Sequence, residues 1–328
     1  MPSNRTLTAI RGVRVGHAQD RRRRTGTTVV LLDPPAMAFA DARGGWPGTY
    51  DTAASDLGKT FIDRHALLLT GGDVYGFDAV GGIRRFLLEK KLAAPTGGGK
   101  MPGIMGTNIY DLGFADALGL DYTSLGYSAC MNASTKPVTQ GNVGAGTGAT
   151  VGPFFGTKGG TKGGTKGGLG SNAAKVGPWT VGAIVVTNCV GNVYDPFGNR
   201  TIGGTRDKVG KGFLEMDDVL EDYVKRSTTR FGTTIGAVGT DAPLDHEQLA
   251  RLVELAHDGI ALAVRPAHMS TDGDTILGFA TGKADRRRLD YRAFDALHHV
   301  AVREVAKSAV NAVLSARSLG GVPGFEDL

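Results

Sequence analysis

The stretch FGTTIGAVGTDAPL, residues 231–244, holds the features on which the fold and the function of this chain depend. Thr233 follows Gly232 directly, and the β-branched, apolar run after it predicts a buried strand that ends in a turn. If the Gly232–Thr233 peptide bond is cut, Thr233 carries a free α-amine beside its own hydroxyl. Such an amine titrates near pH 7.7–8.0, so about neutrality it can activate that hydroxyl as a base. Viewed alone, Thr233 is more simply the first residue of a strand.

The overall composition is that of an ordinary globular protein. The chain has 328 residues, of which 41% are hydrophobic and 21% charged, and its 51 glycines indicate many tight turns. The formal net charge of +5 is modest, and arginine runs at 21–24 and 286–288 account for much of it. Neither run is interleaved with aromatic residues, so we expect no nucleic-acid partner.

Cysteine usage and apolar segments narrow the class further. Cys130 and Cys189 show no CxxC and no paired Cys/His spacing, so neither a disulfide framework nor a metal site is expected. The Gly-Lys-Thr at 58–60 lacks the earlier glycine of a phosphate loop, because position 53 is alanine, and no cofactor is expected. The N-terminus has no apolar signal core and no segment approaches 18 apolar residues, so we expect a cytoplasmic protein without membrane contact.

Strands and helices are predicted in a mixed order. Periodicity and turn residues predict strands at 7–15, 27–32, 37–42, 67–70, 180–186, 233–240 and 275–281, with Pro34-Pro35 forcing a turn between the second and third. Helices are predicted at 74–92, after the capping residues Asp245 and Gln248, and from about 290 to 317. This order predicts an α/β (α+β) fold with two sheets packed between helical layers.

Two segments are expected to be irregular. Thr-Lys-Gly-Gly occurs three times in succession at 157–160, 161–164 and 165–168, which predicts a flexible, cationic surface loop. Residues 208–230 form a charged, poorly patterned linker, and a cut in such a segment costs little.

Five further side chains are candidates for chemistry. Asp272 and Asp274 are separated by one residue before a strand, so both carboxylates face one side and can orient an amine or hold a substrate ammonium. Lys175 and Asn188 flank a strand, and the amide of Asn188 or the hydroxyl of Tyr110 can donate to an oxyanion. Each alone has a simpler structural explanation, such as a turn or a half-buried tyrosine.

Several motifs occur together in a recognisable order. They are IRGVRVGH (10–17), TGTTV (25–29), ADARGG (40–45), TGGDVYG (70–76), KGGLGS (166–171), TTI (233–235), TDAPL (240–244) and DGDT (272–275). On these motifs the chain resembles the self-cleaving N-terminal-nucleophile hydrolases that include the L-aminopeptidase/D-esterases, the β-aminopeptidases and the 6-aminohexanoate-oligomer (nylon oligomer) hydrolases. The resemblance covers nearly the whole length and implies a four-layer αββα sandwich.

The resemblance implies a function for the residues of the opening stretch. Thr233 is the nucleophile that cleavage after Gly232 exposes, so residues 1–232 form an N-terminal fragment and residues 233–328 a C-terminal fragment of one folded domain. The expected product is an amide hydrolase that acts through an acyl-enzyme on small peptides, amino-amides or 6-aminohexanoate oligomers. A homo-oligomer, commonly a tetramer, is also implied.

The resemblance also implies roles for the other candidates. Asp272 and Asp274 orient the new α-amine, Lys175 is a supporting cation, and Asn188 and Tyr110 donate to the oxyanion. The threonine nucleophile and the aspartate pair look closer to the nylon-oligomer hydrolases than to the serine-nucleophile β-aminopeptidases.

Two alternatives remain open. Those two groups typically have asparagine before the nucleophile, whereas this chain has Gly232, which other N-terminal-nucleophile enzymes also use. This departure motivates the alternative of a homologue that does not cleave and binds small amines or peptides. A cysteine amidase acting through Cys130 or Cys189 is the weaker alternative, because no histidine lies at a motif spacing from either.

Overall fold

A long mixed sheet dominates the computed structural model, which describes residues 4–156, 163–207, 209–210, 212–225, 229–282 and 288–328. Its nine strands are β1 (Val13–Asp20), β2 (Thr25–Ala42), β3 (Thr49–Tyr50), β4 (Asp63–Thr70), β7 (Ile104–Asn108), β10 (Gly168–Val176), β11 (Trp179–Asn188), β14 (Thr233–Thr240) and β16 (Thr275–Ala280). They are ordered β10-β11-β14-β16-β2-β4-β7-β3, with β1 paired to β2.

Smaller strands and the helices complete the fold. The short strands are β5 (Ala94–Thr96), β6 (Gly99–Met101), β8 (Thr150–Val151), β9 (Thr165–Lys166), β12 (Asn192–Asp195), β13 (Arg200–Gly203) and β15 (Val264–Arg265). The α-helices are α1 (Ala79–Glu89), α2 (Tyr122–Met131), α3 (Met216–Val224), α4 (His246–Ala263) and α5 (Tyr291–Leu314). The 3₁₀ helices are η1 (Leu7–Ala9), η2 (Ala53–Ser55), η3 (Asp73–Asp78), η4 (Gly144–Thr147), η5 (Pro153–Phe155) and η6 (Phe325–Asp327).

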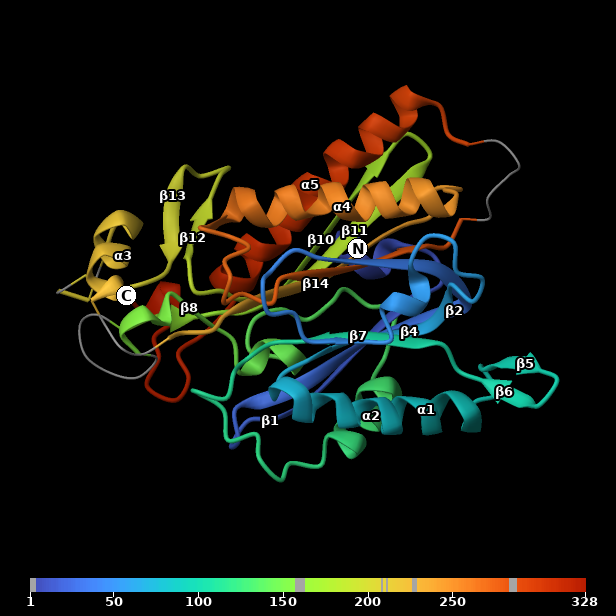
Figure 1. The fold of residues 1–328 in the computed structure, drawn as a ribbon, viewed down its shortest axis with the longest axis horizontal. Coiled ribbons are helices and arrows are strands. Elements are labelled where there is room, and N and C mark those ends of the chain that lie inside the picture. The colour runs from blue at the N-terminus through green and yellow to red at the C-terminus, as the bar shows by residue number, and fades with distance from the viewer. Residues whose placement is uncertain (1–3, 157–162, 208, 211, 226–228, 283–287) are drawn as a thin grey trace.

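Helices cover the sheet on two opposite sides. Figure 1 shows α4 and α5 beside β10, β11 and β14, whereas α1 and α2 lie at the far side of the molecule, near β1. The long strand β2 serves both parts of the sheet, since residues 37–42 pair with β16 while residues 25–32 pair with β1. The sheet therefore has two halves, one packed on α4 and α5 and the other on α1 and α2.

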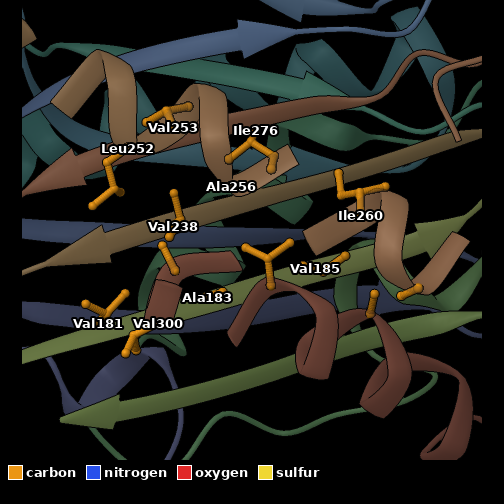
Figure 2. Packing of buried hydrophobic residues seen from close by; sticks show 14 of the residues in the cluster. Val181, Ala183, Val185, Val238, Leu252, Val253, Ala256, Ile260, Ile276 and Val300 are labelled. Atoms are coloured by element: carbon orange, nitrogen blue, oxygen red, sulfur yellow. The ribbon is translucent and has the colours of Figure 1, made fainter. Parts of the chain in front are cut away.

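Three apolar clusters lie between these layers. Along β11, Val185 points to the cluster under α4 and α5, which Figure 2 shows from close by, and Ile184 points the opposite way because strand side chains alternate. The second cluster joins Ile184 to Leu67 of β4, and so lies between the two halves of the sheet. The third joins Leu68 of β4 to Ile83 of α1. Three clusters between four layers confirm the expected αββα arrangement.

The last third of the chain follows its prediction closely. The strand predicted at 233–240 is β14, buried along its whole length between β11 and β16. The carboxylate of Asp245 accepts a hydrogen bond from the Gln248 N–H at 2.8 Å and so caps α4. Residues on both sides of position 232 pair in one sheet, β14 with β11 and β16 with β2.

Several local predictions in the first two thirds are wrong. No turn separates residues 27–32 from 37–42, because β2 runs through Pro34-Pro35, where the pairing with β4 shifts register and no ladder donor is needed. The predicted strand at 7–15 begins only at Val13, after η1. The predicted linker at 208–230 contains α3.

The repeat also differs from its prediction. Residues 157–162 lie outside the described residues, but the third copy is not a surface loop. Thr165 and Lys166 form β9, pair with β8 and are fully buried.

Among the described residues, no helix is long and apolar enough to cross a membrane.

Candidate active site

Thr233 lies at the first position of β14, opposite Asn188 at the end of β11. Only 4% of its surface is exposed. Its Oγ1 hydroxyl donates a hydrogen bond to the carbonyl oxygen of Gly232. The same oxygen accepts the Gly273 N–H at 3.1 Å. The peptide bond between Gly232 and Thr233 is therefore in contact with a hydroxyl and with a donor that can stabilise negative charge on its oxygen.

Gly232 is enclosed so tightly that a side chain does not fit. A Cβ atom built there lies 2.5 Å from the Val190 nitrogen and 2.8 Å from Asp272 Oδ1. Gly232 also forms a parallel bridge with Asp272, and its N–H donates to the Thr271 carbonyl at 3.3 Å. Glycine is thus required by packing at the residue before Thr233, and not by its backbone angles.

Asp274 is a fully satisfied buried carboxylate. Its Oδ1 accepts the Thr234 N–H at 2.6 Å, and its Oδ2 lies 2.9 Å from the backbone nitrogen and 2.8 Å from Nδ1 of His268. The His268 ring packs against the His257 ring, with centroids 5.0 Å apart, and burial lowers the pKa of His257 to about 4. Asp274 therefore ties the start of β14 to a pair of histidines, of which His257 is buried and His268 is half-buried.

Asp272 has fewer donors than its partner, and the backbone N–H of Val190 opposes the rise in its pKa. Its Oδ2 accepts the Met269 N–H at 3.2 Å, whereas Oδ1 is buried without a hydrogen-bond partner among the described residues. Burial, and then the negative charge of Asp274, raise the pKa of Asp272 to about 7. Asp272 can thus gain or lose a proton near neutral pH, directly beside Gly232.

Asn188 and Tyr110 lie near Thr233 and contact one another. The Asn188 amide donates from Nδ2 to the Tyr110 carbonyl at 3.0 Å and accepts the Thr150 N–H on Oδ1 at 2.9 Å. The Tyr110 ring lies 5.3 Å from the Phe231 ring. The structure brings both predicted oxyanion donors to the site, with the amide of Asn188 already hydrogen-bonded.

Lys175 is not at this site. It pairs with Thr180 at the opposite end of the β10–β11 ladder. Thr180 precedes Asn188 by eight residues, or roughly 26 Å at about 3.3 Å per residue. Lys175 is exposed beside a cavity of about 840 Å³ there. The role of supporting cation that the resemblance implied for Lys175 is therefore wrong, because the register of β10 and β11 places Lys175 far from Thr233.

Lys166 is the buried cation that the sequence reading missed. Its ammonium group donates to the carbonyls of Gly167 at 3.0 Å, Gly146 at 3.4 Å and Ala149. The peptide after Ala149 carries the Thr150 N–H that holds Asn188, so one peptide group links Lys166 to the oxyanion candidate. Burial lowers the pKa of Lys166 to about 7. The KGGLGS motif, which begins at Lys166, was the signal that could have identified it. Lys166 also lies in the last copy of the Thr-Lys-Gly-Gly repeat, which predicts an exposed loop.

This arrangement predicts unequal effects for two lysine substitutions. Lys166→Met leaves buried carbonyls without a donor, at roughly 1–3 kcal/mol each, and frees the segment that holds Asn188. We expect a lower unfolding temperature and at least tenfold lower activity in the folded fraction. Lys175→Met, the matched control, should change neither. Thermal unfolding and steady-state rates check this, and equal effects of the two changes would contradict it.

A small cavity opens in front of Thr233. Its volume is about 150 Å³, and its walls are Trp46, Asp73, Asn108, Tyr110, Phe231, Gly232, Thr233 and Thr271. The Phe231 ring packs edge-on against Trp46, with centroids 4.8 Å apart. Phe231 and Tyr110 also line an adjoining cavity of about 270 Å³. The nucleophile candidate thus faces a space whose walls combine aromatic rings with polar side chains.

The two cysteines are poor nucleophiles. Both are buried, and burial raises the pKa of Cys130 to about 12 and that of Cys189 well above its ordinary value. Cys189 lies near the carboxylate pair, whose charges raise its pKa further. Within the described ranges, no group of three or more His, Cys, Asp or Glu side chains is placed to hold a metal ion. The burial and the raised pKa values of the two thiols weigh against a cysteine amidase.

Comparison with known proteins covers almost the whole chain. The model of peptidase family S58 matches residues 5–326. An uncharacterised aminopeptidase of Mycobacterium bovis is 32% identical over 348 residues, which cover 98% of this chain and 97% of the relative. The 6-aminohexanoate-oligomer endohydrolase of Paenarthrobacter ureafaciens is 27% identical over 277 residues, which cover 84% of this chain and 74% of that enzyme.

A solved structure shares the fold. The L-aminopeptidase D-Ala-esterase/amidase of Ochrobactrum anthropi, a variant of the N-terminal-nucleophile hydrolase fold, matches with a TM-score of 0.71 and 21% identity. The match covers 100% of this chain and 90% of that one. The similarity therefore extends across both sides of the peptide bond before Thr233.

Proposed function

The chain belongs to peptidase family S58 and has the N-terminal-nucleophile hydrolase fold, and from this premise we propose that it cuts itself after Gly232 and then hydrolyses amides with Thr233. The observation that carries the proposal is the hydrogen bond from Thr233 Oγ1 to the Gly232 carbonyl, beside the buried Oδ1 of Asp272. Membership of the family shows that the chain is a peptidase or amidase. The cut after Gly232 and the role of Thr233 as nucleophile belong to the proposal.

Self-cleavage begins as an N-to-O acyl shift. Thr233 Oγ1 attacks the Gly232 carbonyl carbon, its proton passes to Asp272, and the Gly273 N–H stabilises the oxyanion. The C–N bond then breaks, the nitrogen takes up a proton, and an ester joins Gly232 to the threonine oxygen. Water hydrolyses that ester, which leaves a carboxylate on Gly232 and a free α-amine on Thr233.

The cleaved chain is held together by its sheet. The ladders of β14 with β11 and of β16 with β2 cross from residues 233–328 to residues 1–232, so we expect both fragments to stay in one domain. In this state the α-amine of Thr233 takes the proton of its own hydroxyl. Asp274 holds the start of β14 in place through the Thr234 N–H.

Catalysis then follows acyl-enzyme chemistry. The Thr233 oxygen attacks a substrate amide, the amine half leaves with a proton, and water hydrolyses the ester on Thr233. We propose short peptides, amino-amides or 6-aminohexanoate oligomers as substrates, in line with the names of the two relatives. A homo-oligomer is also expected, and light scattering measures it.

Denaturing electrophoresis with N-terminal sequencing tests the proposal. We expect two fragments, one of which begins at Thr233, and turnover of aminoacyl p-nitroanilides or 6-aminohexanoate oligomers. An intact chain that turns over substrate would refute the threonine mechanism. An intact chain that binds small amines without hydrolysing them would instead support the alternative of a binding protein.

The pH dependence follows from Asp272. Its pKa of about 7 means that the basic form accumulates as the pH rises through neutrality, so self-cleavage should accelerate from pH 5 to about 8 and then level. Asp272→Asn should abolish this rise and slow cleavage at least 100-fold. Time courses of fragment formation in refolded chain measure both effects. A pH-independent rate in the unaltered chain would contradict the assignment.

The same carboxyl should lower the stability of the fold at neutral pH. Because folding raises its pKa from 3.8 to about 7, protonated Asp272 favours the folded state, and this contribution is lost as the pH rises through about 7. In chains kept uncut by Thr233→Ala, adding Asp272→Asn should raise the free energy of unfolding at pH 8, by at most about 4 kcal/mol. The gain should shrink at pH 4, which denaturant titration at both pH values checks.

A further inference from the structure

The carboxylate pair is badly placed to hold a substrate ammonium. Asp274 already accepts three hydrogen bonds and is fully buried. Asp272 is also fully buried, and neither residue lines the cavity in front of Thr233. An amine-bearing substrate therefore needs another anion at the cavity wall.

Asp73 is the one charged side chain among the residues that line this cavity. Burial raises the pKa of the Asp73 carboxyl, and a hydrogen bond from the Val74 N–H lowers it. Within the described part of the chain, no ion pair involves Asp73. A half-buried carboxylate without a counter-ion is stabilised by any ammonium that enters.

The backbone holds Asp73 in a conformation that needs support. Its φ angle is +52°, in the left-handed region, where a non-glycine residue is uncommon. The Asp73 N–H donates to the Ile109 carbonyl at 3.2 Å, and the N–H of Gly72 before it donates to the Asp111 carboxylate at 2.7 Å. These bonds fix the turn that presents Asp73 to the cavity, and such local strain is typical of ligand sites.

The other walls of the cavity suit the rest of a linear amino-acyl chain. Asn108 is 2% exposed, and its Nδ2 has no hydrogen-bond partner among the described residues. A substrate carbonyl oxygen can satisfy that donor. The rings of Trp46, Phe231 and Tyr110 offer apolar faces to methylene groups.

We propose that Asp73 is the specificity-determining residue that binds the terminal ammonium of a linear aliphatic amino-acyl substrate, with Asn108 donating to its carbonyl oxygen. This inference rests on the proposed function, since it places the substrate in front of Thr233. It names an ω-aminoacyl or unbranched aminoacyl group as the preferred acyl half.

The experiment compares two substrates that differ only in the amine. Asp73→Asn removes the charge and keeps the shape, and asparagine tolerates the left-handed backbone. Kinetics with 6-aminohexanoyl p-nitroanilide and hexanoyl p-nitroanilide should show kcat/KM falling about 10- to 100-fold for the first, mainly through KM, and unchanged for the second. Asp78→Asn, an exposed carboxylate five residues on, is the matched control and should change neither.

Other outcomes separate the two proposals. Equal losses with both substrates would reduce Asp73 to a structural role, and no loss would exclude it from ammonium binding. Electrophoresis first shows whether each variant forms the fragment that begins at Thr233; absence of that fragment from the unaltered protein as well counts against the proposed function alone. Calorimetric titration with hexylammonium chloride then decides the inference without turnover. We expect at least tenfold weaker binding by Asp73→Asn, and equal binding would overturn the ammonium site.

Discussion

Thr233→Ala should leave one uncut chain of 328 residues without hydrolytic activity. The change removes the hydroxyl that contacts the Gly232 carbonyl, so neither the acyl shift nor the later acyl-enzyme can form. Activity should fall by roughly 10⁴-fold or more, the scale seen when a nucleophile is deleted. The fold should persist, because alanine adds no atoms at this position of β14 and removes only a hydroxyl and a methyl group. Electrophoresis and steady-state kinetics measure the two effects.

Thr233→Ser is the matched control for that variant. Serine keeps an Oγ at the same position and loses only a methyl group, so cleavage and turnover should continue within about tenfold of the parent. An uncut Thr233→Ala chain that retained full activity would refute the nucleophile. Cleavage of that chain at position 232 would show that another group attacks the Gly232 carbonyl.

Gly232→Ala should have the second largest effect. The added Cβ meets the Val190 backbone nitrogen at 2.5 Å, and backbone atoms cannot move aside as the end of a side chain can. Residue 232 must therefore shift, and its carbonyl leaves the Thr233 hydroxyl and the Gly273 N–H. Because a misplacement of about 1 Å can cost 100-fold in rate, we expect self-cleavage to slow by at least that factor. The rate of fragment formation measures it.

Gly97→Ala provides a control for the general cost of replacing glycine. No atom lies within 4 Å of a Cβ at position 97, so this variant should cleave at the parent rate. Gly232→Asn introduces the residue that the family resemblance would place before the nucleophile, and it should be impaired at least as much as Gly232→Ala. Normal cleavage in Gly232→Asn would show that the wall formed by Val190 and Asp272 yields, and would remove packing as the reason for glycine.

Local sequence patterns were sufficient to predict the strand that begins at Thr233 and the helix that follows it. The apolar run after Thr233 forms β14, and Asp245 and Gln248 cap α4, because both features depend on residues within a few positions of one another. Asp272 and Asp274 both approach the segment around Thr233, Asp272 at Gly232 and Asp274 at the Thr234 N–H. The family followed from the order of the motifs.

Local sequence patterns failed to predict the positions of two lysines, because the pairing of distant strands and burial decide where these side chains lie. The resemblance to the family implied a supporting role for Lys175, but the register of the β10–β11 hairpin places it at the other end of the ladder from Asn188. Lys166 belongs to a repeat of small and charged residues that predicts a solvated loop, whereas pairing of β9 with β8 buries it. Neither result is visible in a local window.

The sequence by itself determined the nucleophile candidate, the acidic pair and the αββα class, because hydroxyl, carboxylate and periodicity are local properties. Only the tertiary structure decided which groups surround Thr233: the buried Oδ1 of Asp272, the wall that requires Gly232, and the carboxylate of Asp73, which forms no ion pair within the described part of the chain. The reason is physical. Strand register and packing bring together residues far apart in the chain, and burial then sets their charge and their partners.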